Sequence, residues 1–191
     1  MTNRILEFTY RMSSWKLFLL LFALFLVFGW LQQSLPIGLD HLPEMDGGIE
    51  PLDTDTYRAE DVYPRLESLP SEAGSYYQRV LLTTDFFFPI LFRVMLIVLA
   101  TLFAKVYASK GSRLYLLALV PLSSMLADIL ENSSIVLMIE ALPGRLPILP
   151  SAVSFLTRYK WISNYVEWAV IALLGCFSLV YVVQRALRRS E

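Results

Sequence analysis

Hydrophobic residues in this 191-residue chain are gathered into four long runs that polar or turn-forming segments separate. The runs cover Trp15–Leu31, Phe86–Ala108, Leu114–Ile139 and Trp161–Val183. A helix of about 20 apolar residues crosses a hydrocarbon core about 30 Å thick, and every run has about 17 residues or more. We therefore predict an all-α membrane protein, in which residues 1–191 form a single integral membrane domain with four transmembrane helices.

The longest connection, residues 32–85, is predicted to be a partly helical outer loop between the first and second helices. Its first part, 35–55, is rich in proline, glycine and aspartate, which disfavours regular structure. An apolar stripe over residues 56–69 predicts a helix that Pro64 interrupts or bends. A second helix is expected to begin at Ser71 and to run directly into the second span. A second outer loop over 141–159 contains three prolines, so the fourth helix is expected to begin near Lys160.

Lysine and arginine residues lie in the short segments on one side of the predicted bundle. They are Arg4, Arg11, Lys16, Lys105, Lys110, Arg113, Arg185, Arg188 and Arg189. Short segments of this kind stay in the cytoplasm, whereas the long outer loop is acidic. The pattern predicts a multi-pass protein of the bacterial inner (cytoplasmic) membrane with both termini cytoplasmic. The first run has no small-x-small cleavage site after Gly29, so we expect it to be retained as an anchor.

The third run differs from the others because it carries polar residues near its middle. Asp128, Glu131 and Asn132 are spaced so that they share one face of a helix. A carboxylate inside hydrocarbon costs about 2.5–3.5 kcal/mol and usually faces protein or water rather than lipid. These side chains are therefore expected to meet polar partners on neighbouring helices.

Polar residues on the other helices are predicted to reach the same depth. Counted inward from the expected outer end of each helix, Arg93, Glu131 and Glu167 all lie seven or eight residues below the surface. At 1.5 Å per residue this is about 10–12 Å, and Asp128 lies about 16 Å deep. We therefore predict one intramembrane polar cluster. Its members are Asp85, Arg93, Asp128, Glu131, Asn132, Lys160, Asn164 and Glu167.

The charges of this cluster allow two interpretations. The guanidinium of Arg93 can hold two carboxylates. The remaining negative charge can be balanced in three ways: Lys160 reaches down to the cluster, one acid stays protonated, or a cation binds. The cluster is then either a structural network that fixes helix packing or a proton or cation site that opens outward. The inner halves of all four helices are apolar, so a pore through the monomer is not expected.

Enzyme chemistry has little support in the sequence. The only histidine, His41, is in the outer loop, where a surface side chain is favoured over a weak metal site with Asp40 and Glu44. The only cysteine, Cys176, is expected to be a small buried residue. No Ser/His or Cys/His pair, metal-binding motif or glycine-rich phosphate loop is present. We predict no catalytic residues, no metal, no cofactor and no nucleic-acid partner.

Several short motifs resemble a group of small bacterial four-helix membrane proteins without an assigned function. The matching stretches are Pro51-Leu52-Asp53, Tyr57, Val62-Tyr63, Asp85 with Pro89, Asp128-x-x-Glu131-Asn132 and Thr157-x-x-Lys160-Trp161. The resemblance covers residues 47 to about 174 and implies a four-helix fold. It also implies a shared core of Asp85, Asp128, Glu131, Asn132 and Lys160. This chain departs from the group at Arg93 and Glu167, where apolar residues are expected.

These features lead to two functional expectations. The first is a non-enzymatic accessory or scaffold subunit of a larger membrane protein complex, because the chain is small, has aromatic-rich helix faces and carries an acidic outer loop that suits docking. The alternative is a small proton- or cation-linked carrier or sensor that uses the carboxylates of the outer half. The expected partners are the lipid bilayer and other membrane protein subunits.

Overall fold

The protein is all-α in a computed structural model that describes residues 2–42, 51–52, 57–110 and 112–190. Four helical segments are long and apolar enough to cross a membrane, which confirms the predicted four-span architecture. No strand occurs in these ranges. The α-helices are α1 (Thr2–Met12), α2 (Trp15–Ser34), α4 (Ala59–Ser68), α5 (Ser71–Leu82), α6 (Thr84–Tyr107), α7 (Pro121–Ala141) and α8 (Leu149–Ser190), and the 3-10 helices are η1 (Leu39–His41) and η2 (Arg113–Leu119).

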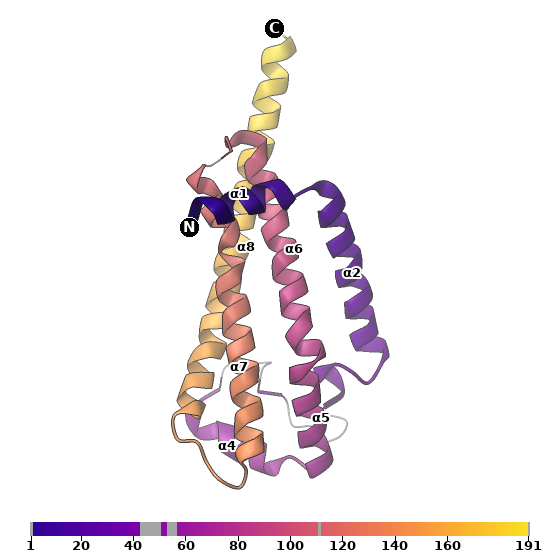
Figure 1. Ribbon diagram of the computed structural model, residues 1–191, viewed down its shortest axis with the longest axis vertical. Helices are drawn as coiled ribbons and strands as arrows, with labels where there is room; N and C mark the ends of the chain where they lie inside the picture. Colours follow the sequence, from indigo (N-terminus) through magenta and orange to yellow (C-terminus); the bar gives the residue numbers. More distant parts are fainter. Residues whose placement is uncertain (1, 43–50, 53–56, 111, 191) are drawn as a thin grey trace.

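Three helices, α6, α7 and α8, form the bundle, and α2 stands at its side (Figure 1). No residue of α2 is buried. It meets α6 through stacked rings, with Phe25 at 5.3 Å from Phe88 and 5.2 Å from Phe92 between centroids. This helix is therefore the most loosely attached of the four spans.

Helix α1 lies across one end of the bundle, which we call the terminal end (Figure 1). Its buried residue Leu6 packs with Ala104 and Tyr115, and Lys105 Nζ donates a hydrogen bond of 2.5 Å to the carbonyl of Ser13. Phe8 remains 65% exposed on the other side of α1. The sequence predicted only a basic flank for this segment, whereas the structure has an amphipathic helix there.

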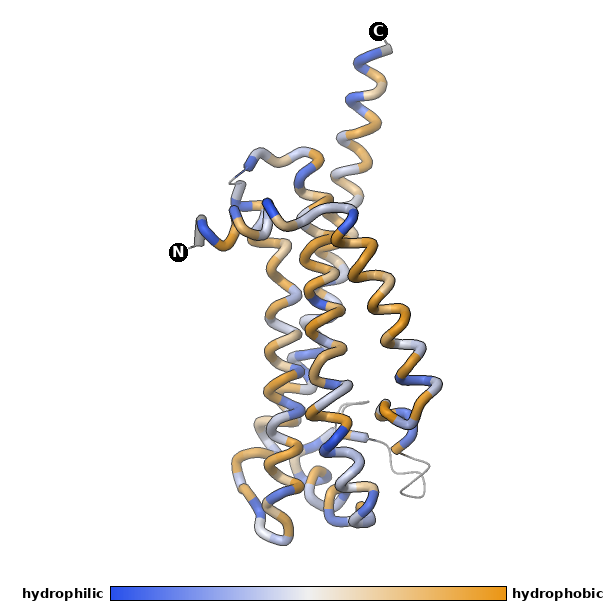
Figure 2. The backbone as a smooth tube through the Cα atoms, turned by 45° about the vertical axis from the view of Figure 1, so that its right-hand side comes forward, coloured by the Kyte–Doolittle hydropathy of each residue, from blue (hydrophilic) through white to orange (hydrophobic). Residues whose placement is uncertain are grey.

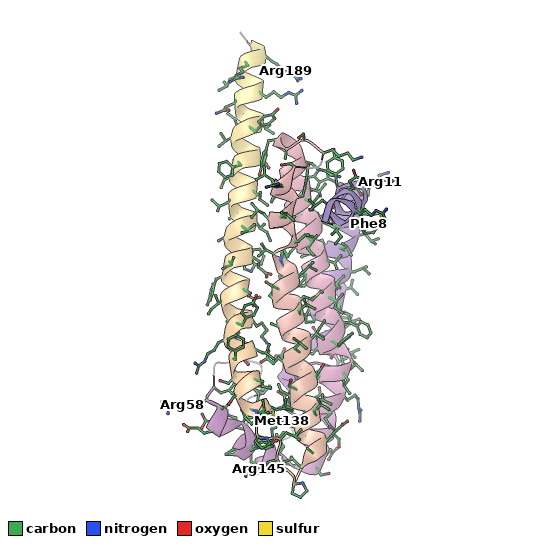
Figure 3. All side chains as sticks on the ribbon, turned by 60° about the vertical axis from the view of Figure 1, so that its left-hand side comes forward. Phe8, Arg11, Arg58, Met138, Arg145 and Arg189 are labelled. Carbon is green, nitrogen blue, oxygen red and sulfur yellow. The ribbon has the colours of Figure 1, made fainter. Side chains whose placement is uncertain are left out.

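Helices α4 and α5 close the opposite end as a cap, so we call this the capped end. Their apolar faces share a core with the end of α7 that includes Tyr77, Leu81 and Met138. Arg145 in the α7–α8 connection pairs with Glu67 of α4 at 2.7 Å (Figure 3). These contacts confirm that the loop between the first two spans is partly helical.

The details of this loop correct several boundaries. Pro64 lies inside α4 without ending it. Helix α5 begins at Ser71 as predicted but ends at Leu82, and Thr83 (φ −119°, ψ −92°) separates it from α6. The predicted irregular part, 35–55, contains the short helix η1; residues 43–50 and 53–56 lie outside the described residues.

The third and fourth spans also differ from their predicted limits. The third is divided into η2 and α7, because Pro121 occupies the first position of α7 instead of kinking a continuous helix. The fourth begins at Leu149, so the predicted loop over 141–159 is wrong and the connection is much shorter. Pro150 misled the prediction because proline is tolerated at the start of a helix. Gly111, between the second and third spans, lies outside the described residues.

The exposed surface of α8 includes the only cysteine of the sequence. Cys176 is exposed on the helix surface, so its predicted burial is wrong. Neighbouring Phe177 is 60% exposed and Leu173 58% exposed. This stretch of α8 therefore presents its side chains to lipid, and the thiol is part of that surface. In Figure 2 hydrophobic positions dominate the length of the bundle, as this arrangement requires.

Candidate functional site

The register between α6 and α7 decides how the polar residues meet. Asn132 Nδ2 donates hydrogen bonds to Asp85 Oδ2 at 2.7 Å and to the Asp85 carbonyl at 3.2 Å. The middle of α7 therefore lies level with the first turn of α6. The rest of α7, residues 133–141, extends into the cap, where Ile135 and Met138 belong to the cap core.

This register contradicts the predicted single layer of Arg93, Glu131 and Glu167. Depth was counted from Ile139, but that end of α7 packs within the cap and not at the start of α6. Ser124 is the α7 residue that reaches the level of Glu167. Glu131 lies seven residues away, about 10 Å nearer the capped end. The polar residues thus form separate groups at two depths.

The deeper group is centred on Arg93 of α6, and we call it the Arg93 group. Its guanidinium contacts Glu167 of α8 at 2.8 Å and donates a hydrogen bond of 2.6 Å to Asn164 Oδ1. Ser124 Oγ of α7 lies 2.8 Å from the other carboxylate oxygen of Glu167. The side chains of Arg93 and Glu167 are 6% and 0% exposed. One buried ion pair therefore joins α6 to α8, and a hydroxyl of α7 reaches the Glu167 carboxylate of this pair.

The group nearer the cap is centred on Lys160 of α8, and we call it the Lys160 group. Lys160 Nζ lies 2.7 Å from Glu131 Oε2 and 3.2 Å from Asp128 Oδ1, both on α7. The predicted position of Lys160 at the rim is wrong, because the residue is 5% exposed and sits well inside α8. Two carboxylates therefore share one ammonium group.

A chain of hydroxyl groups continues from the Lys160 group into the cap. Thr157 Oγ1 hydrogen-bonds Glu131, and it lies 3.0 Å from the hydroxyl of Tyr57. A carboxylate can only accept, so Thr157 donates to Glu131 and accepts from Tyr57. Burial raises the pKa of Tyr57 well above its ordinary value, which keeps this donor protonated. Ser154 Oγ also donates to the Tyr57 carbonyl at 2.7 Å.

A pocket of about 410 Å³ connects these groups on the side of the bundle between α6 and α8. Polar and aromatic side chains line it together. They are Asp85, Phe88, Pro89, Phe92, Arg93, Asp128, Lys160, Trp161, Asn164 and Trp168. The Arg93 group and the Lys160 group thus have separate hydrogen bonds, but residues of both line the same pocket.

The eight predicted cluster residues all take part in these contacts, but sequence reasoning missed several of their partners. Ser124 was not among the predicted cluster residues, and it reaches both the Pro121 carbonyl and Glu167. Thr157 and Tyr57 appeared only as part of a motif. The spacing of Thr157 three residues before Lys160 was the available signal, because such residues share a helix face.

The charges of the site do not balance. Asp85, Asp128, Glu131 and Glu167 are four carboxyl groups, and Arg93 and Lys160 are two basic groups. If all were ionised, the formal charge would be −2. Within the described ranges, Asp85 forms no ion pair, and its side chain is held by Asn132. The site can therefore hold helices together and still accommodate positive charge.

In the described part of the chain, no three His, Cys, Asp or Glu side chains converge in a way that could hold a metal ion. The weak alternative of His41 with Asp40 and Glu44 involves a residue outside the described ranges, since Glu44 is one of those not described.

Polar contacts become sparse toward the terminal end. Thr101 Oγ1 donates to the Ile97 carbonyl at 2.7 Å, and Ser178 Oγ lies 2.7 Å from the Phe103 carbonyl. These hydroxyls satisfy backbone groups of the bundle and do not continue the chain of charged residues. The charged site is therefore confined to the half of the bundle near the cap.

Comparisons with protein-family models, with curated proteins and with solved structures found no match. The fold and the site define the chain as a four-span helical membrane protein with buried ion pairs near its capped end.

Proposed function

We propose that this chain is a non-enzymatic accessory or scaffold subunit of a larger membrane protein complex. In this proposal it lies in the bacterial inner membrane with both termini in the cytoplasm and the cap outside. The observation that carries the proposal is the terminal end of α8, which projects beyond the rest of the fold as a helix with basic and apolar side chains (Figure 1).

The projecting segment is unusual because it is helical although its side chains are exposed. All of residues 181–189 are exposed, including Val182 at 52% and Leu187 at 61%. Arg189 lies far beyond α1 (Figure 3). A short helix is marginal in water, and most helical stability comes from packing an apolar face. A partner with an apolar groove and acidic residues would stabilise this segment.

The capped half suits the scaffold part of the role. The Arg93 and Lys160 groups join α6, α7 and α8, and Tyr57 extends the contacts into the cap. Removing one partner of a buried ion pair costs about 3–5 kcal/mol. Such groups fix how the helices pack, so the chain can present its projecting end in a defined position.

The test is purification from native membranes in mild detergent, followed by mass spectrometry of the proteins that remain bound. We expect larger membrane subunits in fixed stoichiometry, lost when Arg185, Arg188 and Arg189 are changed to Gln. Arg158→Gln is the matched control, because Arg158 is an exposed arginine at the other end of α8. A lone monomer or homo-oligomer, or partners that persist in the triple variant, would contradict the proposal.

A proton- or cation-linked carrier or sensor is the second candidate, and the formal charge of −2 favours it. The two functions differ in what Glu131→Gln does. A carrier or sensor variant would fold normally and lose ion-dependent behaviour in proteoliposomes. A scaffold variant would lose stability or assembly, because the buried ion pair between Lys160 and Glu131 would be lost.

A further inference from the structure

The carboxylate of Asp85 lines the pocket, and no basic side chain of the described residues neutralises it. It accepts a hydrogen bond from Asn132 Nδ2, whereas Asp128 shares Lys160 with Glu131. The basic groups of the pocket are thus already engaged by other acids. An anion entering this space would meet surplus negative charge, and a cation would find an available carboxylate.

The aromatic lining favours an organic cation over a metal ion. At the Arg93 end of the pocket, Phe92 and Trp168 have ring centroids 6.1 Å apart, and the Arg93 guanidinium already lies over the Phe92 ring at 4.8 Å. Phe88 and Trp161 also line the pocket. Trp168 is 51% and Trp161 36% exposed, so ring surface remains for a ligand. Aromatic faces attract ammonium groups that carry carbon substituents, and aromatic cages hold quaternary ammonium ligands. Ca²⁺ and Mg²⁺ instead take about six or more oxygen ligands.

A buried donor lies at the deeper end of the same pocket. Arg93 Nε has no hydrogen-bond partner among the described residues, although the other guanidinium nitrogens bind Glu167 and Asn164. A buried unpaired donor is costly, so an oxygen acceptor is favoured there. Eight residues of α6 separate Asp85 from Arg93, a distance of about 12 Å along the helix.

We infer that the pocket between α6 and α8 is a binding site for an organic ammonium compound with an apolar body. Its ammonium group lies against Asp85, its apolar body lies along the aromatic rings toward Arg93, and an oxygen acceptor about 12 Å from the ammonium meets Arg93. Two sources supply this chemistry: the headgroup and ester region of an aminophospholipid, or a free amine with aromatic or alkyl substituents. The site does not depend on the accessory role proposed above.

The test uses benzyltrimethylammonium as the probe and purified full-length protein in maltoside micelles. Isothermal titration calorimetry gives the affinity, and the part of the tryptophan fluorescence quenching that is lost in Trp168→Leu gives the location, since the chain has four tryptophans. We expect saturable binding that equal concentrations of sodium chloride do not reproduce. Asp85→Asn should weaken it about tenfold, which corresponds to about 1.4 kcal/mol. Glu72→Gln, which removes an exposed cap carboxylate, should leave it unchanged.

A second variant distinguishes a loss of the binding site from a loss of the fold. Trp168→Leu changes a half-exposed ring and should weaken binding in calorimetry while the circular dichroism spectrum stays unchanged. Absence of saturable binding to the wild type, or equal affinity in wild type, Asp85→Asn and Trp168→Leu, would overturn the inference.

Added lipids distinguish the two sources. Phosphatidylethanolamine in the micelles should compete with the probe if the natural ligand is a lipid headgroup, whereas phosphatidylglycerol, which keeps the phosphate and lacks the amine, should not. Probe binding that neither lipid changes assigns the site to a free amine. Equal competition by both lipids would show that the pocket does not recognise the amine, and would overturn the inference.

Discussion

The Arg93–Glu167 pair offers the sharpest test of how this fold is held together. Its atoms are 2.8 Å apart, and the two side chains are 6% and 0% exposed. Arg93→Met keeps the length and apolar stem of the side chain but leaves Glu167 buried without its cation. Removing one partner of a buried pair costs about 3–5 kcal/mol, so we expect this loss of unfolding free energy.

The double variant Arg93→Met/Glu167→Leu separates the cost of an orphaned charge from the value of the pair. Replacing both members by apolar residues of similar volume is often close to neutral. We therefore expect it to be more stable than Arg93→Met alone, with a coupling energy of about 2–3 kcal/mol. Unfolding in mixed dodecyl sulfate and maltoside micelles, followed by circular dichroism, measures the losses for Arg93→Met, for Glu167→Leu and for the double variant.

The control is Arg158→Met, which makes the same chemical change at an exposed position of α8. It should change stability by less than about 0.5 kcal/mol. The reasoning is refuted if Arg93→Met costs no more than this control. It is also refuted if the double variant loses the full sum of the two single losses.

Three further outcomes follow from the contacts. Thr157→Val removes the hydroxyl between Tyr57 and Glu131 and should lower the unfolding free energy by about 1–3 kcal/mol in the same assay. Thr157→Ser keeps the hydroxyl and should be near neutral, so equal losses in the two variants would contradict the hydroxyl chain. Arg145→Gln breaks an exposed pair and should cost less than about 1 kcal/mol. Phe25→Ala removes two ring contacts worth about 0.5–1.5 kcal/mol each. Spin labels on α2 and α6 should then show a broader distance distribution than in Leu24→Ala, and an unchanged distribution would contradict the loose attachment of α2.

The spans could be predicted because their signal is local. A run such as Trp15–Leu31 needs no knowledge of its neighbours to be assigned to the membrane. The polar residues of α7 could be recognised for the same reason, since carboxylates in an apolar run require partners. The composition of the other spans also indicated which helices carry those partners.

The register of the site could not be predicted, because it depends on packing between distant segments. The C-terminal part of α7 looks in the sequence like the end of a transmembrane helix, yet Ile135 and Met138 belong to the cap. That placement shifts Glu131 away from Arg93 and toward Lys160. The early start of α8 at Leu149 moved Lys160 inward in the same way. The pocket itself appears only once α6 and α8 are placed side by side.

The length of α8 has a mechanical consequence. The helix has 42 residues without interruption, which at 1.5 Å per residue is a rod about 63 Å long. Near one end Ser154 and Thr157 hold it to Tyr57, and near the other it carries Arg189 beyond the bundle. A tilt of α8 about its contacts in the middle of the bundle would move both ends in opposite directions. Such a tilt would couple the position of the cap to the position of the projecting end of α8.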